Sequence, residues 1–173
     1  MGRGNTVDRE ALIEEEIFII QAEGEIPEVA FHNAVHHLCS APGGPGLILA
    51  QKEFNALKQA VADRYRTIIL RDLTPSNRDR SLYRGLERSA ANWERLESFA
   101  RREGFDLAVV REEVASVLLH FIHREAHDVA TGRRACCVNC TADRLRALVM
   151  ALPLSMDQLP DNWERLCCPR ETD

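Results

Sequence analysis

The sequence predicts an all-α protein, and three observations indicate this class. Apolar residues recur every three or four positions over most of the chain, which is the spacing of amphipathic helices. Gly- and Pro-rich segments separate these stretches, and no alternating apolar and polar run flanks a hairpin turn. We expect a single compact, bundle-like helical domain of about six or seven helices, covering residues 8–173 behind a flexible N-terminal tail at 1–7.

Length and composition are those of an ordinary globular protein. The 173 residues are 45% hydrophobic and 28% charged, which suffices for a sizeable core. The net charge of −5 disfavours binding to nucleic acid through phosphates. No run of about 18 consecutive apolar residues and no apolar leader is present, so we expect a cytoplasmic protein without a membrane partner. Thiols in that compartment remain reduced, which favours metal or redox roles for the cysteines.

The first predicted helix spans residues 8–23. Asp8 suits the N-cap position and Gly24 suits the stop. Apolar residues at helical spacing define its core face, namely Leu12, Ile13, Ile17 and Ile20. The run Glu14, Glu15 and Glu16 is expected to form a solvated face.

Three further helices are predicted at 27–40, 47–73 and 79–103. Pro27 suits the first position of the second helix, and the segment APGGPG at 41–46 separates it from the third. Pro75 prevents simple continuation of the third helix into the fourth.

The fifth predicted helix extends from a cap at Asp106 to a stop at Gly132. The shorter elements after it are a helix at 142–151 capped by Thr141, a capping box between Ser155 and Gln158, and a last turn at 161–167. The pentapeptide NWERL occurs at 92–96 and again at 162–166, but the flanking residues differ. We interpret this recurrence as coincidence rather than an internal repeat.

The fifth helix carries a histidine stripe. His120, His123 and His127 lie at positions i, i+3 and i+7, so they share a face. The ends of the stripe are about 10 Å apart at 1.5 Å per residue. One metal ion can therefore bind two neighbouring histidines but hardly all three. His123 and His127 are the better candidate ligands, and His120 is a secondary one.

The helix at 27–40 carries a similar stripe of secondary candidates, His32, His36 and Cys39, at i, i+4 and i+7. A pair of ligands on each of two antiparallel helices completes a four-ligand metal site. The alternative interpretation of both stripes is a set of interfacial histidines that hydrogen bond to backbone or carboxylate groups.

The cysteine knuckle near 136–140 is a more specific pattern. Cys137 and Cys140, with two residues between them, precede a predicted helix and can direct two thiolates at one tetrahedral ion. We expect Cys167 or Cys168 to complete the sulfur set and His127 or His123 to supply nitrogen, with zinc as the first candidate metal. Small, buried packing cysteines are the alternative.

Three functional hypotheses follow from these residues. The leading one is a metal-binding protein with a structural or interaction role, with an unknown protein partner or a second copy in a homodimer. The second is a thiol-redox sensor or a metal-dependent enzyme that uses the face of His120, His123 and His127. The third is a metal-free helical adaptor, which predicts an exposed apolar surface. The residues identify no catalytic group or substrate.

Overall fold

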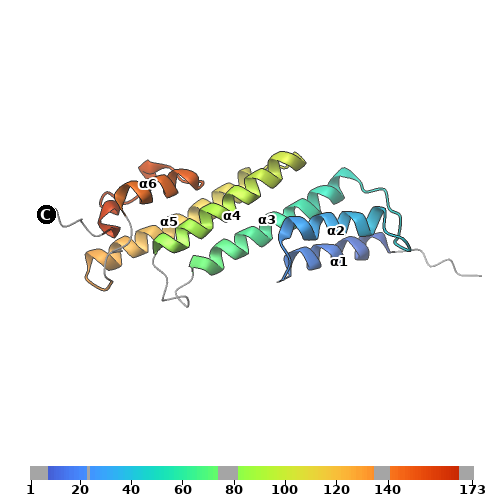
Figure 1. Cartoon of the computed structure of the whole chain (residues 1–173), viewed down its shortest axis with the longest axis horizontal. Coiled ribbons are helices and arrows are strands. Elements are labelled where there is room, and N and C mark those ends of the chain that lie inside the picture. Colours follow the sequence, from blue (N-terminus) through green and yellow to red (C-terminus); the bar gives the residue numbers. More distant parts are fainter. Residues whose placement is uncertain (1–7, 23, 74–81, 135–140, 168–173) are drawn as a thin grey trace, which may run out of the picture. The chain divides into compact units, whose positions relative to one another are not determined.

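The computed structural model of the chain describes residues 8–22, 24–73, 82–134 and 141–167 (Figure 1). These residues form helices and include no extended β-strand, which confirms the predicted all-α class. They fall into two compact units. Unit 1 comprises residues up to Tyr65 together with Phe99–Phe105, and unit 2 comprises Arg66–Ser98 together with residues from Asp106 onward. The predicted tail at 1–7 lies outside the described residues.

Unit 1 contains α1 (Arg9–Gln21), α2 (Pro27–Cys39), most of α3 (Gln51–Leu73) and the end of α4 (Leu82–Glu103). Helix α1 packs against α2 (Figure 1). The core of the unit consists of Ile13, Ile20, Ala30, Phe31, Ala34, Leu38, Leu57, Ala60, Val61, Tyr65 and Phe99. Phe31 and Phe99 meet edge to face with their ring centres 5.2 Å apart, an arrangement that aromatic pairs favour.

Two polar groups inside unit 1 are satisfied by hydrogen bonds. The hydroxyl of Tyr65 donates to the carboxylate of Glu28 at 2.5 Å. Lys58, which is buried, donates from Nζ to the backbone carbonyl of Glu103 at 2.7 Å. Because buried polar groups are costly without partners, these bonds allow the side chains to lie in the core.

The start of α1 follows the predicted signal, but α1 ends at Gln21 rather than at 23, and α3 begins later than predicted. Asp8 caps α1 by accepting a hydrogen bond from the Ala11 amide at 3.3 Å. Helix α3 begins at Gln51 rather than 47, because the side chain of Glu53 accepts a hydrogen bond from the Ala50 amide at 2.7 Å and fixes the start there. Ile48, expected in the helix, is instead outside it and exposed.

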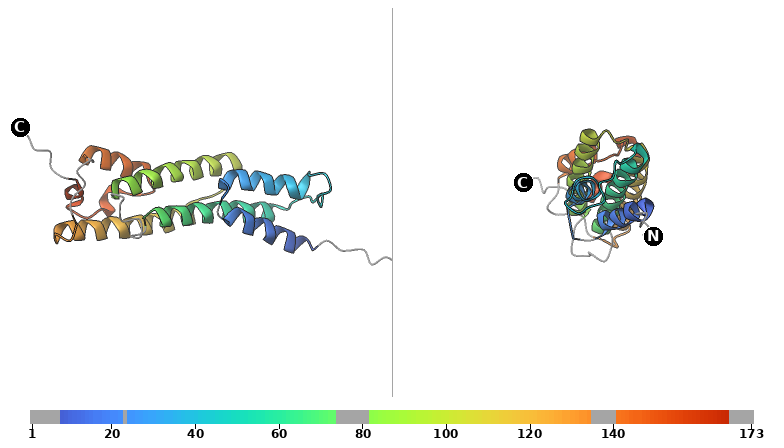
Figure 2. Two further views of the ribbon diagram at one scale, coloured as in Figure 1. Left: turned by 60° about the horizontal axis from the view of Figure 1, so that its bottom comes forward. Right: turned by 90° about the vertical axis from the view of Figure 1, so that its right-hand side faces the viewer.

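Unit 2 contains the rest of α3, α4 up to Ser98, α5 (Ala108–Ala130), α6 (Ala142–Ala151) and the 3-10 turns η2 (Met156–Gln158) and η3 (Trp163–Leu166). Turn η3 packs on α5, as Figure 2 also shows. The core of this unit consists of Leu86, Trp93, Leu96, Val110, Val114, Leu118, Ile122, Leu145, Val149, Trp163 and Leu166.

The predicted caps at Thr141 and Ser155 are confirmed, whereas the N-cap of α5 is Leu107 rather than Asp106. Asp106 lies one residue before that cap, and its carboxylate accepts a hydrogen bond from the Ala108 amide at 2.9 Å. Thr141 caps α6 through the Arg144 amide at 3.3 Å. The Ser155 amide donates to the side chain of Gln158 at 3.1 Å, as the capping box requires. Helix α5 ends at Ala130, just before the left-handed Gly132.

The two copies of NWERL adopt different local structures. Residues 92–96 lie within α4, whereas residues 162–166 form η3. In both copies the Trp and the Leu are buried, and an Arg lies over the Trp ring. The guanidinium of Arg111 is 5.2 Å from the centre of the Trp93 ring, and that of Arg146 is 5.7 Å from the Trp163 ring. Side-chain pattern, and not backbone conformation, is what the two copies share.

Candidate functional site

The contact between α1 and α2 includes a buried carboxylate. Glu16 is 6% exposed, and its side chain contacts Nδ1 of His37, which lies half-exposed at the edge of α2. The sequence prediction that Glu16 lies on a solvated face is therefore wrong, because α2 packs over that side of α1. The same prediction is confirmed for Glu14 and Glu15, which are exposed.

Four large apolar side chains near the end of α1 and the start of α2 are exposed to solvent. The exposed fractions are 73% for Phe18, 45% for Ile19, 52% for Ile26 and 43% for Val29. We call this set the α1–α2 apolar patch. Other exposed large apolar side chains of the described residues are dispersed along the sequence, at Ile48, Val109, Met150 and Met156. Isolated apolar side chains are ordinary on a protein surface, but a local cluster is typical of an interaction site.

The helical register places most of the α1–α2 apolar patch along the border of the two helices. Val29 comes three positions after Ile26, and His37 comes eight positions after Val29. At helical spacing, these three residues lie on one side of α2. His37 contacts Glu16, which shows that this side borders α1. Ile19 lies one turn after Glu16 and so occupies the same border from the α1 side. Phe18 extends the patch onto the solvent face of α1.

Acidic residues accompany the α1–α2 apolar patch. Glu14 precedes Phe18 by four residues and Glu15 precedes Ile19 by four, so each lies one turn away on the same face. Glu25 immediately precedes Ile26 and is exposed. The carboxylate of Glu28 instead accepts the hydrogen bond from Tyr65 inside unit 1. The patch is therefore apolar at its centre and negatively charged around it.

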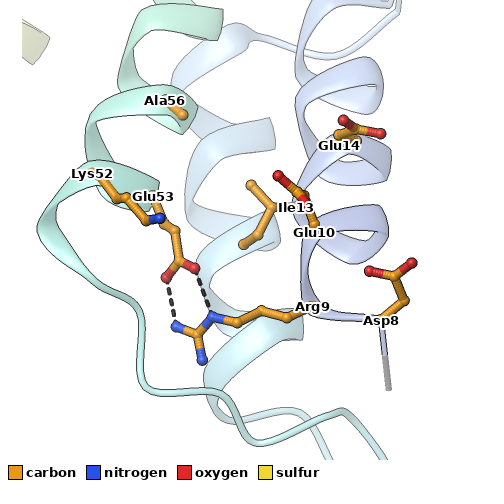
Figure 3. Close-up of a pocket in the computed structure, with 8 residues that line it drawn as sticks. All are labelled: Asp8, Arg9, Glu10, Ile13, Glu14, Lys52, Glu53 and Ala56. Atoms are coloured by element: carbon orange, nitrogen blue, oxygen red, sulfur yellow. Dashed lines mark hydrogen bonds and ion pairs between the residues drawn. The ribbon is translucent and has the colours of Figure 1, made fainter. Parts of the chain in front are cut away.

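A shallow pocket of about 800 Å³ lies at the other end of α1, between α1 and the start of α3 (Figure 3). It is lined by Asp8, Arg9, Glu10, Ile13, Glu14, Lys52, Glu53 and Ala56. Arg9 closes one side by donating to both carboxylate oxygens of Glu53, at 2.6 and 2.5 Å, and to the carbonyl of Ile48 at 2.5 Å. Arg9 and Glu53 neutralise each other, and the remaining charged lining residues are Asp8, Glu10, Glu14 and Lys52.

The Arg9–Glu53 pair shifts the pKa of both of its members. The hydrogen bonds from Arg9, and then that from the Ala50 amide, lower the pKa of Glu53 from 4.5 to about 2. The same pair raises the pKa of Arg9. The pair therefore ties the start of α1 to the start of α3 at neutral pH.

We expect the Glu53→Gln substitution to lower the free energy of unfolding at neutral pH and to have less effect in acid. The pKa of Glu53 is lower in the folded state, so its contribution is present above about pH 4.5 and is lost as the pH falls towards about 2. Urea denaturation of both proteins across this range measures the difference. Arg9→Met should reproduce most of this pH dependence, since Arg9 is its main cause. A difference that stays constant down to about pH 2 would show that the pair does not form in solution.

The predicted histidine ligands are exposed, and none joins a metal cluster within the described part of the chain. His120, His123 and His127 lie on the outer face of α5. Nε2 of His123 is 3.0 Å from the carbonyl oxygen of Gln158, so it hydrogen bonds to η2. His32 and His36 are exposed on α2. Among the described residues, no group of three or more His, Cys, Asp or Glu side chains is close enough to hold a metal ion.

The cysteines are only partly described. Cys39 is a half-buried free thiol on α2. Cys167 is buried directly after η3 and is disulfide-bonded. A cysteine binds a metal as its thiolate. Cys167 is disulfide-bonded, so it can bind a metal only after reduction. Cys137, Cys140 and Cys168 lie outside the described residues, and the predicted sulfur site remains a prediction.

The described chain is thus an all-helical protein that carries an exposed apolar patch with acidic surroundings on α1 and α2. Within the described helices, none combines the length and apolar character needed to cross a membrane. The chain belongs to the family described as "Repeat of unknown function (DUF7826)", which matches residues 8–154. This match contains both helices of the patch and excludes the second NWERL. No curated protein matches the chain. No solved structure matches it either.

The residues of the α1–α2 apolar patch were not predicted as functional. A signal for them is present in the run Ile17, Phe18, Ile19 and Ile20, which places apolar side chains around the whole circumference of the last turn of α1. Only one side of that turn packs in the core, where Ile20 is buried. A helix that is apolar all round needs a second apolar surface to cover it.

Proposed function

We propose that this protein is a helical interaction module that binds another protein through the α1–α2 apolar patch. The observation that carries this proposal is the exposure of four large apolar side chains at the joined ends of α1 and α2, namely Phe18, Ile19, Ile26 and Val29. Burying about 100 Å² of such surface contributes roughly 2.5 kcal/mol, so four large side chains can supply a substantial part of a binding free energy. The exposed apolar surface is what the adaptor hypothesis predicts.

The backbone around the α1–α2 apolar patch suits a preformed docking surface. Helices α1 and α2 pack against each other, and contacts from Glu16 to His37 and from Glu28 to Tyr65 hold them in place. A surface that is already ordered loses little conformational entropy on binding. A partner therefore meets the apolar side chains in fixed positions.

The other predicted roles rest on sequence spacing. Zinc binding by Cys137 and Cys140 with a histidine such as His127 remains a separate proposal, compatible with an interaction function. A redox role has support from the disulfide at Cys167, since a disulfide is a group that reduction can open. Neither proposal depends on the α1–α2 apolar patch.

A photo-crosslinking amino acid placed at Phe18 tests the proposed function in the cells that make the protein. We expect one discrete covalent adduct, identified by mass spectrometry, and the purified partner should bind the wild-type protein more tightly than Ile19→Asp. The same amino acid at Val109 is the matched control, because Val109 is as exposed as Phe18 and lies outside the patch. Equal adducts from both positions, or none from Phe18, would contradict the proposal.

A further inference from the structure

We infer that the partner of the α1–α2 apolar patch is a basic amphipathic helix, with apolar side chains on one face and Lys or Arg beside them. This inference rests on the proposed function and specifies the chemistry of its partner. Two features support this inference. The charge around the patch is negative, and the backbone of α1 and α2 is helical.

The hairpin of α1 and α2 is strongly acidic. Its described acidic residues are Asp8, Glu10, Glu14, Glu15, Glu16, Glu25 and Glu28. The only Lys or Arg in the described residues of this hairpin is Arg9, whose Nε and Nη2 donate to Glu53 and Ile48. The hairpin therefore holds a local excess of negative charge that the rest of the chain partly balances.

The negative charges lie where a docked partner would meet them. Glu15 is exposed and lies one turn before Ile19 on α1. Glu25 is exposed and directly precedes Ile26 in the segment before α2. A partner that covers the apolar centre brings its flanking side chains to within a few ångströms of these carboxylates. Lys or Arg at those positions gains attraction, whereas Asp or Glu is repelled.

The backbone of the hairpin favours a helical partner over an extended one. Helices α1 and α2 use their backbone groups internally, so this surface has no free strand edge for a partner strand to pair with. A helix brings its own backbone bonds already satisfied and presents apolar residues every three or four positions. That spacing matches Ile26, directly before α2, and Val29, three positions later within it.

A second copy of this chain fits the α1–α2 apolar patch less well. In a symmetric dimer each patch contacts itself, which brings Glu14 and Glu15 of one copy near acidic residues of the other. Like charges held close at an interface are unfavourable. An anionic membrane surface is disfavoured for the same reason, because its negative potential repels an acidic hairpin.

The test uses the whole 173-residue chain and two fluorescent 16-residue helical peptides with the same apolar pattern. One peptide has Leu and Lys, and the other has Leu and Glu. We expect fluorescence anisotropy to show binding of the Leu/Lys peptide at least about tenfold tighter than of the Leu/Glu peptide. Phe18→Ser and Ile26→Ser should each weaken Leu/Lys binding by about tenfold, because each removes one apolar anchor. Val109→Ser, at an equally exposed site outside the patch, should leave it unchanged.

Separate substitutions test how much the negative charges contribute to peptide binding. The double change Glu15→Gln and Glu25→Gln should weaken Leu/Lys binding several-fold at low salt and have little effect at about 1 M salt, where charges are screened. The double change Glu94→Gln and Glu112→Gln is the matched control, since it also removes two exposed carboxylates, on α4 and α5. An equal effect of this control would show that the peptide responds to net charge alone and would overturn the inference.

Other outcomes separate the inference from the proposed function. Failure of the Leu/Lys peptide to bind, or equal binding of the Leu/Glu peptide, overturns the basic helical partner. The adduct at Phe18 would still support an interaction function. A concentration-dependent dimer in light scattering that Phe18→Ser abolishes would identify a second copy as the occupant. Patch-dependent binding to vesicles containing about 30% phosphatidylserine would identify a lipid surface, and that result would overturn both proposals.

Discussion

Replacing Trp93 with alanine is expected to lower the free energy of unfolding by about 3–5 kcal/mol. Trp93 is almost wholly buried in the core of unit 2. The substitution leaves a large cavity and removes the ring beneath Arg111, whose guanidinium also pairs with Glu97 at 2.7 Å. Urea denaturation followed by circular dichroism measures the loss.

The second NWERL provides an internal comparison for Trp93. Trp163 has the same neighbours in sequence and a similar Arg over its ring, but it is slightly more exposed and lies in a short 3-10 turn. Trp163→Ala should therefore cost less than Trp93→Ala. Met150→Ala, at an exposed site, should change stability by less than about 0.5 kcal/mol. A cost for Trp93→Ala below that of Trp163→Ala would contradict the described packing.

Replacing Arg64 with methionine is expected to raise the free energy of unfolding by about 1–3 kcal/mol. Arg64 is 7% exposed, and its enclosed Nε has no hydrogen-bond partner among the described residues. A buried donor without a partner loses its bonds to water and gains none in return. Methionine keeps much of the side-chain volume and adapts to irregular spaces without bringing a charge. The shift of the urea midpoint at an unchanged slope measures the gain.

Lys58→Met is the matched control for Arg64→Met. Lys58 lies on the same helix and is also 7% exposed, but its Nζ donates to the Glu103 carbonyl at 2.7 Å. Removal of Lys58 breaks this hydrogen bond and leaves a carbonyl at the end of α4 with fewer partners. We expect no gain in stability from Lys58→Met. Equal gains from both substitutions would show that burial of charge, rather than the missing partner of Nε, determines the effect.

The helices were predictable from the sequence because their signals are local. Spacing of apolar residues marks a helix wherever it occurs, and caps such as Asp8 and Thr141 act on amides within three residues. The start of α3 was placed four residues early because Ile48 continues the apolar spacing. The helix begins later because the side chain of Glu53 accepts a hydrogen bond from the Ala50 amide, three residues before it.

Side-chain environments were less predictable because they depend on distant neighbours. Glu16 resembles Glu14 and Glu15 in the sequence, yet it is buried because His37 of another helix covers it. Phe18 and Ile19 resemble core residues in the same way, since apolar spacing does not distinguish a core face from a docking face. The predicted site at Cys137 and Cys140 remains a prediction, because these residues lie outside the described part of the chain.

The division of the chain into two units has a practical consequence for truncation and proteolysis. Unit 1 is assembled from the N-terminal residues up to Tyr65 and the separate segment Phe99–Phe105. A fragment that stops after Tyr65 therefore ends inside α3 and lacks Phe99, the ring that packs on Phe31. Cutting the chain there exposes core surface that the intact protein covers, and such a fragment is expected to aggregate. Protease nicks inside α3 or α4 should accordingly destabilise both units at once.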